Sequence, residues 1–347
     1  ALGALVQGLV PANSLLDPTA YVGFGWMGVP LFFVLSGWLL GGQVIRADIT
    51  AGYLRHFWTR RFLRIYPAVW AELLVLLLIA GSIPGLVDEA GYKTLHLQFL
   101  LWLNLPPLMA APLNLVWWTL PVELTFYMLL PLLGWCAGLV NWRVLLLSSL
   151  LITLSWRFFI FYSAEVDNYV AILPVLDSLP GTLFTFMLGF SLNFFPDALT
   201  VEQRQKGTIV GLLLLLGLMQ WQLHMDAVYW SGHWILVVWP PLVALAIAVL
   251  VYYLKDPLPS MAWLSSRVLV WLGHISFGIY LWHFQVMRVM VLLFPDIWST
   301  PWQSLLALMV VVPITLVLAV LSFYLIERPL MGWGKKRLSA TERSLNS

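Results

Sequence analysis

Residues 60–83 of the chain read RRFLRIYPAVWAELLVLLLIAGSI, and they indicate the fold class. Three arginines, Arg60, Arg61 and Arg64, stand at the start of this stretch, and an apolar run from residue 65 to residue 83 follows them. A helix of about 20 mostly apolar residues is long enough to cross a bilayer. The stretch therefore predicts a membrane-spanning helix with a cluster of positive charge at one end.

The composition of the whole chain extends this prediction. Of its 347 residues, 61% are hydrophobic and 10% are charged, and the mean hydropathy is +0.89. Apolar runs such as residues 212–216 do not alternate with polar residues, which favours helices over a membrane β-barrel. The formal net charge is only +2, and the basic residues stand beside the apolar runs, so we expect the lipid bilayer and no nucleic acid as a partner.

Ten apolar segments are candidate transmembrane helices. They are residues 2–16, 22–40, 65–83, 117–139, 144–161, 179–195, 208–223, 234–254, 268–294 and 302–326. A further apolar segment, residues 96–114, is broken by Pro106, Pro107 and Pro112, and we expect it to be re-entrant or interfacial. The predicted fold class is all-α: a polytopic membrane protein with about ten transmembrane helices and this one extra segment, forming a single domain over residues 1–347.

Lysine and arginine in the short loops predict the orientation, because such residues concentrate on the cytoplasmic side. They form five groups: Arg46, Arg55, Arg60, Arg61 and Arg64; Arg143; Arg204 and Lys206; Lys255 and Arg267; and Lys335, Lys336 and Arg337. All five groups fall on one side if the segment 96–114 does not cross. We therefore expect both termini to be cytoplasmic.

Four clusters interrupt the apolar pattern, and the first two combine small or charged residues with apolar ones. Residues 28–37, GVPLFFVLSG, allow close helix approach and place the hydroxyl of Ser36 within a span, although packing alone explains them equally well. The second cluster is Arg60, Arg61 and Arg64. Guanidinium groups bind phosphates with two hydrogen bonds, whereas the simpler interpretation is a positively charged membrane anchor.

The third cluster is residues 117–127, WWTLPVELTFY. A carboxyl group at the start of a span is unfavourable unless it faces a wet cavity or a partner, so Glu123 could accept a proton from a hydroxyl substrate or form a structural ion pair with an arginine. The aromatic side chains of Trp117, Trp118 and Tyr127 could stack on sugar rings. An aromatic belt at the membrane surface is the alternative.

The fourth cluster, residues 273–284, holds His274 and His283 on one span. They are nine residues apart and fall on opposed faces of a helix, so they do not share a metal, and we predict no metal site. His283 could orient a substrate or Glu123, or it could be a hydrogen-bonded core histidine. In residues 326–329, IERP, the charges of Glu327 and Arg328 are most simply an anchor, and Pro329 a helix stop.

Together, and in this order, these motifs resemble the acyltransferase 3 family of integral membrane O-acyltransferases, which includes O-antigen acetylases and periplasmic glucan succinyltransferases. The resemblance covers nearly the whole chain. It implies transfer of an acyl group, usually acetyl, from cytoplasmic acyl-CoA to a hydroxyl of an extracytoplasmic or lipid-linked glycan. Acetyl-CoA and succinyl-CoA both remain possible donors, and a bacterial inner membrane is the implied location.

The resemblance also implies roles for individual residues. Arg61 and Arg64 match the paired arginines of the family that engage the CoA phosphates, with Arg60 nearby. Glu123 matches the acidic position after a tryptophan-serine-leucine motif, which here reads Trp118-Thr119-Leu120, and is the candidate catalytic acid or base. Ser36 and His283 match further motif positions, so we assign Ser36 to cofactor binding and His283 to catalysis.

One departure from the family concerns the first helix, where the family normally carries a histidine regarded as a catalytic base. Here no histidine precedes His56, and the nearest polar residue by spacing is Gln7, which cannot take up a proton at neutral pH. A missing upstream segment, an inactivating substitution and a divergent enzyme that uses Glu123 alone are the three interpretations. Because the chain begins at Ala1 without methionine, we expect further residues upstream.

Two function classes compete with the enzyme. A carrier of glycan or lipid could use the same polar interior, and loss of the first-helix histidine would suit it, but the sequence has no evident internal repeat of the kind common in such carriers. A purely structural membrane protein explains neither Glu123 nor the paired arginines. We therefore expect an acyl-CoA-dependent O-acyltransferase that transfers the group directly.

Overall fold

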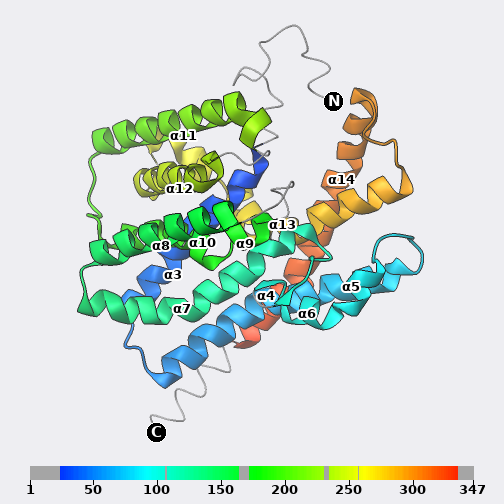
Figure 1. Cartoon of the computed structure of the whole chain (residues 1–347), viewed down its shortest axis with the longest axis horizontal. Coiled ribbons are helices and arrows are strands. Elements are labelled where there is room, and N and C mark those ends of the chain that lie inside the picture. The colour runs from blue at the N-terminus through cyan, green and yellow to red at the C-terminus, as the bar shows by residue number, and fades with distance from the viewer. Residues whose placement is uncertain (1–23, 106–107, 164–171, 230–233, 257, 335–347) are drawn as a thin grey trace. The chain divides into compact units, whose positions relative to one another are not determined.

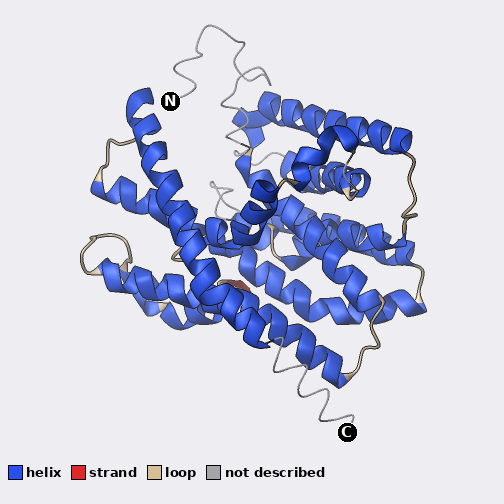
Figure 2. Cartoon of the chain, turned by 180° about the vertical axis from the view of Figure 1, so that it is seen from behind, coloured by secondary structure: helices blue, strands red, loops and turns tan. Residues whose placement is uncertain are grey.

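The structure of the chain, a computed structural model, describes residues 24–105, 108–163, 172–229, 234–256 and 258–334. Within these ranges it is built of helices (Figure 2). The two strands found there, β1 (Asn104–Leu105) and β2 (Leu108–Met109), form one short antiparallel pair in which Asn104 faces Met109.

Eight helical spans among the described residues are long and apolar enough to cross a membrane. They are Gly25–Ile45, Ala51–Ala80, Leu115–Leu139, Trp142–Ser163, Val201–Met225, Ile235–Leu254, Arg267–Leu293 and Trp302–Gly334. Each corresponds to one predicted segment, and the predicted segment 179–195 is a shorter apolar helix, Leu179–Phe194. The segment 2–16, with Gln7, lies outside the described residues, as do Lys335, Lys336 and Arg337. The predicted all-α polytopic fold is confirmed.

The individual elements carry the labels of Figure 1. The α-helices are α3 (Gly28–Ile45), α4 (Ala51–Ala80), α5 (Glu89–Lys93), α6 (Leu95–Leu100), α7 (Thr119–Leu139), α8 (Trp142–Ser163), α9 (Leu173–Leu176), α10 (Leu179–Ser191), α11 (Val201–Tyr229), α12 (Ile235–Leu254), α13 (Arg267–Leu293) and α14 (Pro301–Ser322). The 3₁₀ turns are η1 (Gly25–Met27), η2 (Leu115–Trp118), η4 (Leu192–Phe194) and η5 (Pro259–Ser265), and η6 (Phe323–Glu327) is a π-helix.

The chain divides into two compact units. Unit 1 contains Thr50–Pro121 and Ser265–Ser347, and unit 2 contains Leu2–Ile49 and Val122–Leu264. Unit 1 therefore holds α4 to α6, the strand pair, η2, α13, α14 and η6, while unit 2 holds α3 and α8 to α12. Helix α7 begins in unit 1 and continues in unit 2.

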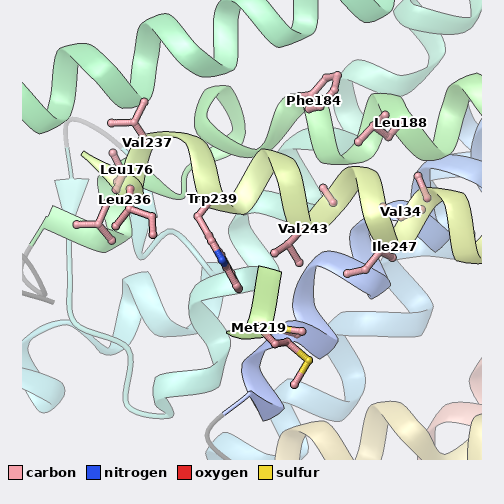
Figure 3. Packing of buried hydrophobic residues seen from close by; sticks show 14 of the residues in the cluster. Val34, Leu176, Phe184, Leu188, Met219, Leu236, Val237, Trp239, Val243 and Ile247 are labelled. Atoms are coloured by element: carbon pink, nitrogen blue, oxygen red, sulfur yellow. The ribbon is translucent and has the colours of Figure 1, made fainter. Parts of the chain in front are cut away.

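The apolar core of unit 2 is formed by side chains from α3, α8, α10, α11 and α12 (Figure 3). Trp239 of α12 lies at its centre, fully buried, and donates its indole N–H to the carbonyl of Leu218. The same cluster contains Val34, Met219 and Val243, among others. Because these helices also expose many large apolar side chains, the core and the outer surface are both apolar, as expected of a protein in lipid.

Helices α3 and α10 of unit 2 approach each other at glycines. A methyl group on Gly37 would overlap the carbonyl of Phe186, and one on Gly189 would overlap the carbonyl of Val34. Small residues permit such backbone contact between membrane helices. The close helix approach predicted from residues 28–37 is thus present at Gly37.

Helix α7 runs in the same direction as α3 within unit 2 (Figure 1). Phe33 of α3 and Phe126 of α7 both stack on Phe186 of α10, with ring centroids 4.3 Å and 4.0 Å apart. Farther along both helices, Val44 packs on Gly134. Two spans that run in the same direction must have an odd number of crossings between them, so the observed direction agrees with one crossing by α4 and none by residues 96–114.

In unit 1, the segment 96–114 folds against α4. The indole of Trp70 stacks on Phe99 at 4.5 Å and donates its N–H to the Phe99 carbonyl, while the hydroxyl of Tyr66 donates to the Leu100 carbonyl. Gln98 is fully buried and bonds to the backbone of Ala111 and Leu113. In its described residues, 96–105 and 108–114, the segment contains the short helix α6 and the strand pair and no membrane-length helix, as predicted.

Candidate active site

The arginine cluster lies in the first half of α4. Thr50 caps this helix by accepting a hydrogen bond from the backbone N–H of Tyr53. Arg61 and Arg64 are three residues apart, so they share one face of the helix. Arg60 is exposed, and its guanidinium lies 3.2 Å from Nε2 of His56. The Arg61 guanidinium lies 5.8 Å from the ring of Phe57. The structure therefore groups the predicted phosphate-binding residues on consecutive turns.

Glu327, the last residue of η6, lies beside this arginine cluster. Its side chain is 1% exposed, accepts a hydrogen bond from the hydroxyl of Ser322 at 3.0 Å, and lies close enough to Arg64 for their charges to interact. The π-helix η6, which ends at Glu327, packs against α4. Glu327 is therefore buried and hydrogen-bonded within unit 1, a placement that its interpretation as part of a membrane anchor did not include.

The predicted helix stop at Pro329 is wrong. The helical span continues to Gly334, where a methyl group would overlap the side chain of Leu63. Proline lacks an N–H group and its ring clashes with the carbonyl four residues earlier. The π-helix over Phe323–Glu327 widens the turn at this place, so the chain passes Pro329 without ending its helix.

A second buried acid, Glu72, lies eight residues after Arg64 on the same helix, which corresponds to about 12 Å along the axis. Its carboxylate accepts a hydrogen bond from Nδ2 of Asn114 at 2.6 Å and another from the indole N–H of Trp117 at 2.9 Å. All three side chains are fully buried. Nδ2 of Asn114 also donates to the carbonyl of Leu281 on α13.

The predicted site residue His283 lies on α13. Its Nδ1 lies 2.8 Å from the carbonyl oxygen of Tyr280 and 3.1 Å from that of Ile279. Because carbonyl oxygens only accept hydrogen bonds, Nδ1 must carry the proton, and in the neutral ring Nε2 carries the lone pair. In this tautomer, Nε2 of His283 is the hydrogen-bond acceptor of the ring. Its assignment to catalysis remains a prediction.

Glu123 lies one turn into α7, in unit 2, and its side chain is 3% exposed. Tyr127, one turn farther along, is also buried. Their neighbour Phe126 belongs to the ring stack that joins α7 to α10. The catalytic assignment of Glu123 and the sugar-binding assignment of Tyr127 remain predictions.

The remaining predicted site residues are placed as follows. Ser36 is buried on α3 directly before Gly37, at the contact with α10, and its role in cofactor binding remains a prediction. Trp117 is buried with its N–H donated to Glu72, and Trp118 is half-buried. Arg60, Arg61, Arg64, Trp117, Trp118 and His283 belong to unit 1, whereas Ser36, Glu123 and Tyr127 belong to unit 2.

Several polar residues with many contacts were not predicted. Besides Glu72 and Asn114, they include Arg288, which donates to the carbonyls of Leu113 and Gly85, and Arg157. An ionisable residue within an apolar span is itself a signal of a buried partner, and Glu72, Arg157 and Arg288 all carry it. The residues that pair with these three side chains give no signal of their own in the sequence, because they lie many positions away from them along the chain.

Comparison with known proteins gives a family match over most of the chain. The family model described as an acyltransferase domain, of the acyltransferase 3 family, matches residues 1–324. No solved structure matches the chain.

Curated relatives match along most of this chain. Nodulation protein 10 of Rhizobium leguminosarum bv. viciae is 28% identical over 93% of this chain and 86% of its own length. The peptidoglycan O-acetyltransferase OatA of Listeria monocytogenes is 25% identical, and a putative O-acetyltransferase of Staphylococcus aureus is 24% identical. These two matches cover 88% and 91% of this chain, but only 51% and 54% of the relatives, so the chain spans about half the length of each.

Proposed function

The chain belongs to the acyltransferase 3 family, and we therefore propose that it is an acyl-CoA-dependent O-acyltransferase of glycans. The proposed donor is cytoplasmic acetyl-CoA, with succinyl-CoA as the second candidate, and the proposed acceptor is a hydroxyl of an extracytoplasmic or lipid-linked glycan. The O-acetyltransferase names of two relatives support the acetyl group. The proposed location is the bacterial inner membrane, with both termini cytoplasmic.

The observation that carries this proposal is the grouping of arginines on α4 directly before the apolar half of that helix. Arg61 and Arg64 present two guanidinium groups on one face, which fits the phosphates of CoA, and Arg60 stands on the turn before Arg64. Glu327 lies near enough to Arg64 for their charges to interact. A carrier of uncharged glycans has no need for this arrangement.

Glu123 is the proposed base of the reaction. Its carboxylate accepts the proton of the acceptor hydroxyl, and the hydroxyl oxygen forms an ester bond with the acyl carbon of the thioester. The carbon–sulfur bond breaks, and the proton is returned to the departing CoA thiolate. Trp118 and Tyr127 are proposed to contact the sugar, and His283 is proposed to orient the reacting groups through Nε2.

The test is transfer of isotope-labelled acetyl from acetyl-CoA into a crude envelope glycan fraction by membranes that contain the protein. We expect transfer by the unchanged chain and a loss of at least about 100-fold in Glu123→Gln. Gln7→His is included to test the first helix. Label that appears only in Gln7→His would mean that the chain as it stands is inactive, and no label with either acetyl-CoA or succinyl-CoA would contradict the proposal.

Binding of CoA is tested separately with Arg61→Gln and Arg64→Gln. We expect KM for acetyl-CoA to rise about tenfold or more in each, because each loses a charge-assisted hydrogen-bond donor. Arg55→Gln is the matched control, since Arg55 is an exposed arginine on the same helix outside the proposed site. An equal effect of all three substitutions would show that only the general positive charge matters.

A further inference from the structure

Glu72 is a buried carboxyl group for which the proposed reaction has no use. It lies within a membrane-length helix, where an ionisable side chain is unfavourable without strong partners. Its oxygens are 2.6 Å from Nδ2 of Asn114 and 2.9 Å from Nε1 of Trp117, and its side chain is not exposed. Both oxygens are thus engaged by protein donors, so Glu72 is poorly placed to reach a substrate.

The orientation of Asn114 is determined by its other contacts. Nδ2 donates to the carbonyl of Leu281 at 2.8 Å as well as to Glu72, and Oδ1 accepts the backbone N–H of Val116 at 3.2 Å. Reversing the amide would place Oδ1 against two acceptors and break all three bonds. Asn114 therefore requires an acceptor at the position that Glu72 occupies.

These contacts converge on one short piece of chain, η2 and the first turn of α7. Asn114 and Trp117 bond to Glu72 of α4, and the hydroxyl of Tyr280 on α13 contacts the hydroxyl of Thr119 and the carbonyl of Val116. The start of α7 is consequently held between α4 and α13 within unit 1. Glu123 follows Thr119 by one turn of the same helix.

We propose that Glu72 is a positioning residue that, through Asn114 and Trp117, fixes the first turn of α7, the helix whose next turn carries Glu123. This role rests on the proposed function as far as catalysis is concerned. The helix start itself is a structural property that can be measured without any activity. Glu72 acts through other residues and does not touch the reacting atoms.

The test compares Glu72→Ala and Glu72→Gln with the unchanged full-length protein in detergent or membranes. Glu72→Ala removes the acceptor from two buried donors. Since a misplacement of about 1 Å in an active site lowers rates about 100-fold, we expect kcat to fall about 100-fold while KM for acetyl-CoA changes less than about twofold. Glu72→Gln retains one acceptor oxygen at the same reach, so we expect a smaller loss of about tenfold.

The second readout is amide hydrogen exchange of peptides that cover η2 and the start of α7. We expect exchange there to become at least about tenfold faster in Glu72→Ala. Thr153→Val is the matched control, because it also removes a buried polar group that makes two hydrogen bonds: the Thr153 hydroxyl donates to the carbonyl of Pro180 and accepts from the N–H of Phe184, both in unit 2. It should leave exchange at η2 and the kcat unchanged at temperatures where it is folded.

The outcomes separate this inference from the proposed function. Faster exchange at η2 in Glu72→Ala, without transferase activity in the unchanged protein, would uphold the positioning of the helix start and reject the acyl transfer. Unchanged exchange would overturn the inference whatever the activity. A large rise in KM for acetyl-CoA at constant kcat would also overturn it, since that result would place Glu72 in donor binding.

Discussion

Arg157 shows how a single side chain can hold several elements of a membrane protein together. In unit 2 its guanidinium donates to the carbonyls of Leu236 and Gly181 and forms an ion pair with Asp177 at 2.6 Å. The side chain of Arg157 is 1% exposed and that of Asp177 is 24% exposed. Arg157 thereby joins α8 to α10, α12 and the residue after α9.

At the residue scale, we predict that Arg157→Met strongly destabilises unit 2. The substitution keeps most of the apolar stem but leaves a carboxylate and several carbonyls without their donor, a loss of about 3–5 kcal/mol when a buried pair is broken. Thermal unfolding in detergent measures it. The control is Arg143→Met on the same helix, where an exposed guanidinium over Trp142 contributes at most about 1 kcal/mol. Equal melting temperatures for both variants would contradict the prediction.

The sequence singles out residues that belong to a motif, and it does not reveal residues whose partners are distant along the chain. The arginines of α4 and Glu123 were identified because charge is rare in the apolar runs. Glu72 is equally rare in its surroundings, but its partners Asn114 and Trp117 lie 42 and 45 residues away along the chain. No local spacing predicts such a pairing, so only the folded structure reveals it.

At the element scale, the contact of α3 with α10 depends on Gly37. We predict that Gly37→Ala destabilises the protein by about 1–3 kcal/mol, because the added methyl group forces the helix backbones apart. Gly217→Ala is the control, since a methyl group there meets no atom within 4 Å and alanine favours a helix over glycine. Thermal unfolding of both variants checks the prediction, which fails if Gly37→Ala is as stable as the unchanged protein.

A pH dependence is expected where η4 and α12 end. Asp197 bonds to Nζ of Lys255 at 2.8 Å, and this hydrogen bond, followed by the charges of Lys255 and Arg46, lowers the pKa of Asp197. A carboxyl group with a lowered pKa in the folded state adds stability above its unfolded pKa, about 3.9, and loses this contribution as the pH falls through the folded value.

The measurement is the melting temperature of Asp197→Asn and of the unchanged protein between pH 6 and pH 2.5. The unchanged protein should be slightly more stable at pH 6, and the two should converge as the pH falls below 4. The difference will be small because the Asp197 side chain is 98% exposed. A difference that grows toward low pH would contradict the assignment.

The elements themselves were largely predictable, because an apolar run of sufficient length has few alternatives to a helix in lipid. The boundaries of these helices were harder to predict from the sequence. Helix α4 begins at Ala51, well before the apolar run at residue 65, since its arginine-bearing turns are helical although they are polar. Pro329 was mistaken for a helix stop because a π-helix has no recognised pattern in a single sequence.

At the scale of the whole molecule, the distribution of basic residues predicts that both ends of the chain face the cytoplasm. We expect a reporter that fluoresces only in the cytoplasm to be active when fused after Ser347. An alkaline phosphatase, which is active only outside, should be inactive at the same place. As a matched fusion, phosphatase inserted between residues 296 and 301, in a loop without lysine or arginine, should be active. The reverse pattern would invalidate the predicted orientation.

The π-helix at the end of α14 also sets the direction in which the side chains after it point around the helix axis. One extra residue in a helical turn rotates the subsequent side chains by about 100° relative to an uninterrupted α-helix. The side that carries Gly334 faces Leu63 only because this rotation has taken place. Loss of a single residue from Phe323–Glu327 would therefore turn the last stretch of the helix away from α4, even though every side chain of that stretch would be unchanged.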